Sequence, residues 1–170
     1  MSSLTSIKLL IEAFGKSGRD ISTIMPPEFP DPVAFRNELE SIPQHLSVAD
    51  ASYRDDRVKC VFAIAPVLGG AFSAEGLASI KIPVKMVVGE ADQMAPAAPN
   101  ASYFARYIRG AQLSILKNVG HYTFLAEATE AGKRELPLFC LASPEVNRAS
   151  THRIVGNLAK EFFQRHLNAP

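Results

Sequence analysis

The sequence predicts an α/β fold built on a parallel sheet. Three short runs rich in apolar and β-branched residues, at 58–65, 84–88 and 112–116, are each followed by a segment with helical periodicity. Strands and helices that alternate in this way are joined by right-handed crossovers, which makes neighbouring strands parallel. Strands covered on both faces are apolar at nearly every position, as the runs at 58–65 and 84–88 are. We therefore expect a three-layer αβα sandwich that forms one domain over residues 1–170.

Two segments precede the first predicted strand. A helix is expected from near Leu4, capped by Ser2 or Ser3 and ended by one of the glycines that follow. Residues 20–57 are rich in proline and predict an irregular excursion over the protein surface, with a short helix over 33–39.

The run at 58–65 is the strongest predicted strand, and we expect helices to cover both of its faces. Cys60 lies within it and is interpreted as a small core residue rather than a nucleophile or a disulfide partner. A tight loop over 68–72 follows, after which Ser73 is suited to cap a short helix that reaches about Ser79.

Two longer helices complete the pattern. Pro99 suits the first turn of a helix through Ile108, with a buried face formed by Tyr103, Phe104, Tyr107 and Ile108. Residues 127–141 are predicted to be irregular. Ser143 then opens the last helix, with Ile154, Leu158 and Phe162 in one apolar register and Val155, Ala159 and Phe163 in the adjacent one.

An acid follows the second predicted strand and a histidine follows the third. Asp92 lies just beyond Gly89, and the strand 112–116 leads into Gly120 and His121. The carboxyl ends of parallel strands meet at one edge of a sheet, where α/β folds place their chemistry. This order matches the acid and the base of a Ser–Asp–His triad. The alternative is that both are loop residues without a chemical role. No serine has the Gly-x-Ser-x-Gly context of a nucleophile.

Together these motifs resemble the C-terminal part of the α/β-hydrolase family, within it the dienelactone-hydrolase-like esterases. The resemblance covers about 58–167 and rests on Ala65-Pro66 with Gly69 and Phe72, Gly89-Glu90-Ala91-Asp92 with Pro96, Gly120-His121, and the final helix. It implies the last three strands of that fold with their helices. It also implies that Asp92 is the triad acid, that His121 is the general base, and that the substrate is a small ester or lactone. Phe72, Met94 and Tyr122 would contribute to substrate binding, and no cofactor is expected.

The chain also departs from the family. The first five strands of the family's sheet have no counterpart here. Relatives carry a cysteine after the catalytic histidine that could pair with one like Cys140, but this chain has none over 125–128, so we expect no disulfide. Residues 1–7 match the small residues and the helix that follow the nucleophile in the family, so we expect that Met1 is not the original start and that the nucleophile directly precedes it.

A second hypothesis is a non-catalytic half-domain, derived from this fold, that binds or dimerises. The strand at 58–65 would lack its usual neighbour, and an unpaired apolar edge recruits another chain. We therefore expect a homodimer through this edge, or aggregation of the chain when it is expressed alone.

Composition narrows the classes of partner. The net charge is +1, and 21% of the residues are charged, so no basic surface favours nucleic acid or an anionic membrane. No apolar run is long enough to span a bilayer, and the N-terminus does not have the pattern of a signal peptide, which makes the cytoplasm the default location. The histidines, at 45, 121, 152 and 166, show no metal-ligand spacing, so no metal is expected.

Overall fold

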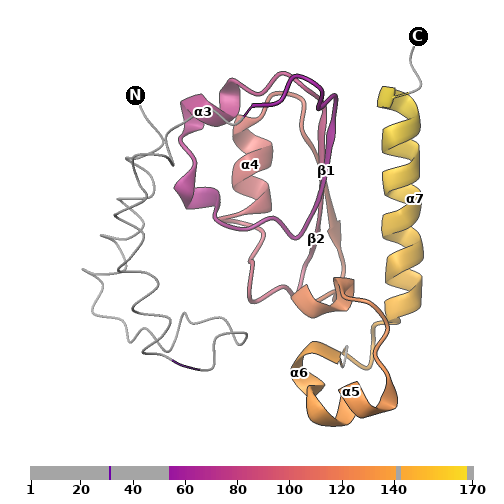
Figure 1. The fold of residues 1–170 in the computed structure, drawn as a ribbon. Helices are drawn as coiled ribbons and strands as arrows, with labels where there is room; N and C mark the ends of the chain where they lie inside the picture. Colours follow the sequence, from indigo (N-terminus) through magenta and orange to yellow (C-terminus); the bar gives the residue numbers. More distant parts are fainter. Residues whose placement is uncertain (1–30, 32–53, 141–142, 168–170) are drawn as a thin grey trace.

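The computed structural model describes residue 31 and residues 54–140 and 143–167. In this part of the chain, three parallel strands form one sheet in the order β1 (Val61–Ile64), β2 (Val84–Gly89), β3 (Gln112–Leu116). Helices α3 (Ala74–Ala78) and α4 (Ala101–Tyr107) cover one face, and α7 (Arg148–Leu167) covers the other (Figure 1). The predicted α/β sandwich on a parallel sheet is therefore confirmed.

The core lies on both sides of the central strand β2. Its side chains Met86, Val87 and Val88 are fully buried. On one face, Met86 packs in a cluster with Leu77 of α3, Phe104 of α4 and Ile108, the residue that follows α4. On the other face, Phe62 of β1 contacts the aromatic rings of Phe162 and Phe163 in α7, each at a centroid distance of 6.1 Å. Burial of each such side chain contributes about 1.5–3 kcal/mol.

Several local predictions are confirmed. The strand β3 has the predicted bounds, and β2 is one residue longer than predicted. The hydroxyl of Ser73 caps α3 by accepting the backbone N–H of Gly76 at 3.0 Å. Helix α4 begins at Ala101 rather than at Pro99 and ends at Tyr107; of its predicted buried face, Phe104 and the adjoining Ile108 are buried, whereas Tyr103 and Tyr107 are half-buried.

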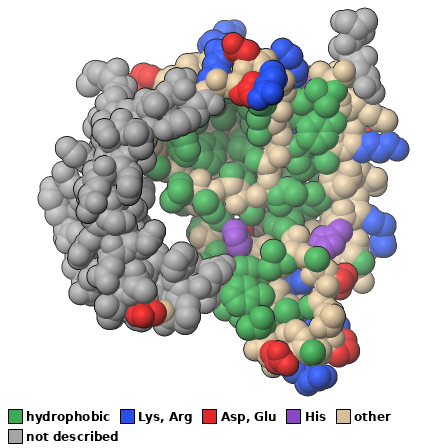
Figure 2. Space-filling view, viewed as in Figure 1, with side chains coloured by type: hydrophobic (Ala, Val, Ile, Leu, Met, Phe, Trp, Pro, Cys, Tyr) green, Lys and Arg blue, Asp and Glu red, His purple; other side chains and the backbone are tan. Residues whose placement is uncertain are grey.

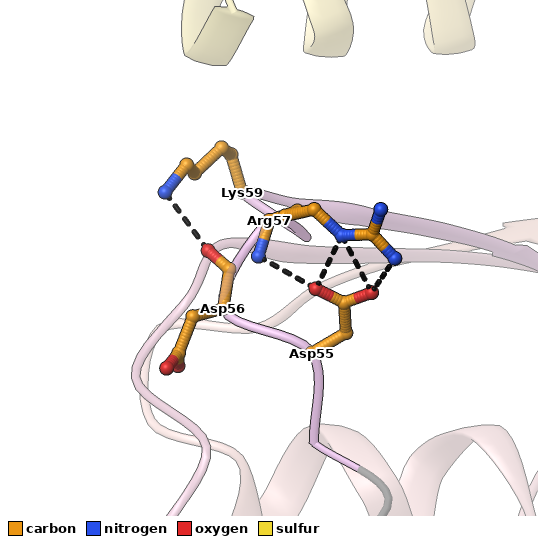
Figure 3. Close-up of polar contacts among 4 residues, drawn as sticks. All are labelled: Asp55, Asp56, Arg57 and Lys59. Atoms are coloured by element: carbon orange, nitrogen blue, oxygen red, sulfur yellow. Dashed lines mark hydrogen bonds and ion pairs between the residues drawn. The ribbon is translucent and has the colours of Figure 1, made fainter.

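The first strand is shorter than the predicted run at 58–65, and a charged turn precedes it (Figure 3). In this turn the guanidinium of Arg57 donates to the carboxylate of Asp55, and Lys59 donates to the carbonyl of Asp56. The hydrogen bond from Arg57 lowers the pKa of Asp55 below its ordinary value. Because this pair is exposed to solvent, it contributes little to stability.

Helices lie on both faces of the first strand, as expected, since Phe62 contacts α7 and Ala63 packs against the cluster with Leu77 and Phe104, but they leave part of the strand exposed. Val61 and Ile64 remain 36% and 47% exposed. Among the described residues β1 pairs only with β2, so it forms an edge of the sheet and lacks the neighbours that would bury it. Cys60 precedes β1 and is half-buried, so it is not the core residue that the sequence suggested.

The segment predicted to be irregular after the third strand is partly helical. It contains α5 (Glu130–Glu135) and α6 (Pro137–Cys140). Thr129 starts α5 by accepting the N–H of Gly132 at 3.1 Å, and Lys133 pairs with Glu130 at 2.7 Å. The sequence did not predict these helices because glycine and proline are usually unfavourable in helices. Pro137, however, is the first residue of α6, a position where proline is favourable.

The last helix begins later and buries a narrower stripe than predicted. It starts at Arg148 because the side chain of Asn147 caps it, accepting the N–H of Ser150 at 2.8 Å. Val155 and Phe162 are buried, but Ile154 and Phe163, which the sequence placed on the apolar face, are 49% and 37% exposed. The buried residues therefore come from both predicted registers, and Phe163 still contacts Phe62 of β1, but the apolar face is narrower than predicted because Ile154 is exposed.

Some predictions lie outside the described residues. These are the helix from near Leu4, the helix over 33–39, and the excursion over 20–57 apart from residues 31 and 54–57. Within the described ranges, no helix combines the length and the apolar character needed to cross a membrane. Cys140, like Cys60, is a free thiol.

Candidate active site

The acid of the predicted pair follows the end of β2. Gly89 is the last residue of this strand, and a Cβ added to it would lie 1.9 Å from the carbonyl oxygen of Val119. Only glycine allows the segment after β2 to approach the segment after β3 so closely. The backbone N–H of Ala91 donates to that same Val119 carbonyl at 3.0 Å. These contacts bring Asp92 against the segment that carries His121.

The base follows the end of β3 and begins a short 3-10 helix, η3 (His121–Phe124). Asn118 turns the chain between the strand and this helix with φ at 60°, in the left-handed region that asparagine tolerates better than most residues. Thr123 within η3 is buried, and its carbonyl accepts a hydrogen bond from a ring nitrogen of His152 in α7 at 3.0 Å. The helix on the far face of the sheet thus supports the histidine segment.

Asp92 and His121 form a hydrogen-bonded pair. The Nδ1 atom of His121 lies 2.8 Å from the Oδ2 atom of Asp92, whose side chain is completely buried. The other carboxylate oxygen, Oδ1, accepts the backbone N–H of Ala95 at 2.6 Å. The expectation that the two side chains lie within hydrogen-bond reach, at the carboxyl ends of adjacent strands, is confirmed.

This arrangement determines the chemistry that the imidazole can perform. An ionised carboxylate only accepts hydrogen bonds, so Nδ1 carries the ring proton when the imidazole is neutral. The Nε2 atom, on the other side of the ring, is then free to accept a proton. The side chain of His121 retains 27% exposure, whereas that of Asp92 has none. A buried acid therefore orients a base that is accessible from outside.

The pocket beside this pair has a volume of about 210 Å³. Its walls come from the segments after β2 and β3, from η3 and from α6, and they comprise Ala91, Asn118, Gly120, His121, Tyr122, Thr123, Leu138 and Ser143. The ring of Tyr122 lies edge-on to that of His121 and also contacts Phe139 of α6. Hydrophobic side chains and histidines share the face of the molecule that Figure 2 shows.

The three predicted substrate-binding residues are not brought together. Tyr122 lines the pocket, but neither Phe72 nor Met94 does. Phe72 packs its ring against Phe104 and is 47% exposed, and Met94 is also largely exposed. The sequence missed Leu138 and Ser143 as pocket residues, because the short helix α6 that brings this segment back towards His121 was not predicted.

Arg148 is a further residue that sequence reasoning missed. Its side chain is buried at the start of α7 and donates to the carbonyls of Ala126 and Phe139, each at 3.0 Å. The guanidinium of Arg148 thus links α7 by hydrogen bonds to the residues just before α5 and to α6. Two of its donor groups bond to separate carbonyls, an arrangement that the compact ammonium of lysine reproduces poorly.

A larger hollow, lined by Arg54–Asp56, Val58, Lys59 and Ser79–Ile82, lies at the amino ends of β1 and β2. It is therefore at the opposite edge of the sheet from Asp92 and His121, and α/β folds bind their ligands at the carboxyl edge.

Within the described part of the chain, no group of three or more His, Cys, Asp or Glu side chains is placed to hold a metal ion. No protein-family model matches the sequence, and no curated protein matches it either.

Proposed function

We propose that this chain is part of an ester or lactone hydrolase of the α/β-hydrolase family, in which Asp92 is the acid and His121 the general base. The observation that carries the proposal is the 2.8 Å contact between a buried carboxylate and a more exposed imidazole at the carboxyl ends of adjacent parallel strands. An ion pair with a purely structural role requires only that the two side chains lie close together. Asp92 and His121 also follow adjacent strands in the order acid, then base, at the sheet edge where a triad is found.

The nucleophile in this proposal is a serine outside these 170 residues. As its oxygen bonds to the ester carbonyl carbon, Nε2 of His121 accepts the hydroxyl proton, and Asp92 stabilises the resulting imidazolium. His121 returns the proton to the leaving alcohol when the carbonyl re-forms. It then takes a proton from the water that attacks the acyl-enzyme and passes that proton to the serine. Tyr122, which lines the pocket beside His121, is proposed to contact the substrate.

The chain by itself should therefore be inactive. We expect hydrolysis of 4-nitrophenyl acetate near the uncatalysed rate and no labelling by a fluorophosphonate probe, because the pair has no nucleophile to activate except water. Labelling is read by intact mass, with an active serine esterase as the positive control. Stoichiometric labelling of any serine in the chain, including Ser143 in the pocket wall, would refute this assignment of roles.

A second candidate function is that of a binding or dimerisation half-domain, and the edge of β1 favours it. This strand has a neighbour on one side only among the described residues, and it exposes Val61 and Ile64. Unpaired strand edges of this kind pair with other chains.

We therefore expect the purified chain to form a dimer or larger species, measured by light scattering over a range of concentrations. Val61→Lys should shift it towards the monomer, because a charged side chain on an edge strand opposes pairing. Ile115→Lys is a matched control, since Ile115 is similarly exposed but lies on β3, at the other edge of the described sheet. A wild-type chain that stays monomeric at high concentration would argue against this interface.

A further inference from the structure

The segments that carry Asp92 and His121 are joined by their backbones and by one side chain. We refer to residues 90–92 as the acid loop and to residues 117–121 as the base loop. The backbone N–H of Glu90 donates to the carbonyl of Leu116 at 2.8 Å, which continues the pairing of β2 with β3. The Glu90 carboxylate, through Oε2, accepts the backbone N–H of Asn118 at 3.2 Å. Glu90 thus contacts the chain on both sides of the turn into the base loop.

Asn118 is the point at which the base loop leaves the direction of β3. Its φ of 60° lies in the left-handed region, which asparagine adopts more easily than most residues but less easily than glycine, so neighbouring contacts help to hold it there. The carboxylate of Glu90 is the described acceptor for its backbone N–H. A hydrogen bond to this N–H constrains the backbone that leads, three residues later, to His121.

We propose that Glu90 is a positioning residue for His121. By fixing the backbone of Asn118, its carboxylate sets the path of the base loop and so the alignment of the imidazole with Asp92. The catalytic significance of this role rests on the proposed function, but the role itself concerns the Asp92–His121 hydrogen bond and is measured on that bond.

A second carboxylate provides a matched control. Glu145 also contacts Asn118, but it accepts from the side-chain amide, at 3.1 Å, and not from the backbone. Both glutamates are exposed, and both carry the same charge. If charge near Asn118 were sufficient, the two glutamates would be equivalent. If the constraint on the backbone matters, only Glu90 affects His121.

The test measures the Nδ1 proton of His121 by nuclear magnetic resonance on the full chain. This proton is assigned by its loss in His121→Ala, and its exchange rate with water reports how often the bond to Asp92 opens. We expect Glu90→Ala to speed exchange about fivefold, which corresponds to about 1 kcal/mol at 25 °C. Glu90→Gln retains an acceptor oxygen and should restore slow exchange, and Glu145→Ala should exchange like the wild type.

Equal exchange rates in Glu90→Ala and Glu145→Ala would overturn the proposal, as would a failure of Glu90→Gln to restore the bond. If Glu90→Ala does not fold, Glu90→Asp provides the same test, because it keeps the charge but withdraws the carboxylate by one methylene; it should exchange faster than the wild type. The measurement involves no ester turnover. A failure of the hydrolase proposal in labelling experiments is therefore distinguishable from a failure of this one.

Discussion

Replacing Asp92 by asparagine should lower kcat about 10⁴-fold in a polypeptide that joins this chain to its nucleophile. The amide oxygen of the new side chain can still accept the N–H of Ala95, as Oδ1 of Asp92 does at 2.6 Å. Its NH₂ group then faces Nδ1 of His121 and donates to it. The ring proton moves to Nε2, and His121 can no longer accept a proton from a serine. The measurement is the steady-state hydrolysis of 4-nitrophenyl acetate.

Glu127→Gln is the control for this substitution, because it makes the same carboxylate-to-amide change at an exposed position. It should leave the rate unchanged. A rate for Asp92→Asn within a factor of about ten of the wild type would mean that the carboxylate does not set the tautomer of a catalytic base.

Replacing Gly89 by alanine should destabilise the chain by about 3 kcal/mol, at the upper end of the range for overpacking. The new Cβ would lie 1.9 Å from the carbonyl oxygen of Val119 and 2.6 Å from its carbonyl carbon. Both atoms belong to the backbone, so no side-chain rotation relieves the clash. The base loop must move, and His121 with it. The free energy of unfolding in urea measures the first effect, and exchange of the Nδ1 proton of His121 measures the second.

Gly156→Ala is the matched control for that prediction. A Cβ added to Gly156 meets nothing within 4 Å, and this residue lies within the long helix α7. Alanine should stabilise the chain there by about 0.5–1 kcal/mol, because glycine is unfavourable in helix interiors. If Gly89→Ala and Gly156→Ala had the same free energy of unfolding, the acid and base loops could move apart without a loss of stability.

The pair at the site could be predicted from the sequence because it depends on local patterns. Each of β2 and β3 is recognisable as a short apolar run, and sheet topology places the loops that follow both runs at the same edge of the sheet. The sequence therefore places Asp92 and His121 near each other, and the contacts between their loops set the final alignment.

The rest of the site depends on contacts between distant segments, which local patterns do not encode. The bond from Asn118 to Glu90 joins residues 28 positions apart, and Arg148 contacts a carbonyl 22 positions away. Nor does apolar character alone reveal whether a strand is central or at an edge. For this reason the sequence predicted deeper burial for the run that contains Val61 than the structure shows for β1.

The central claim is that His121, oriented by Asp92, activates a serine. The most direct test is fluorophosphonate labelling of the polypeptide that contains this sequence in its natural source, followed by mass spectrometry of the labelled peptide. We predict one labelled serine, in a Gly-x-Ser sequence outside these 170 residues, and loss of labelling in His121→Ala. A folded natural polypeptide that takes up no probe, or one whose labelling survives His121→Ala, would contradict the claim.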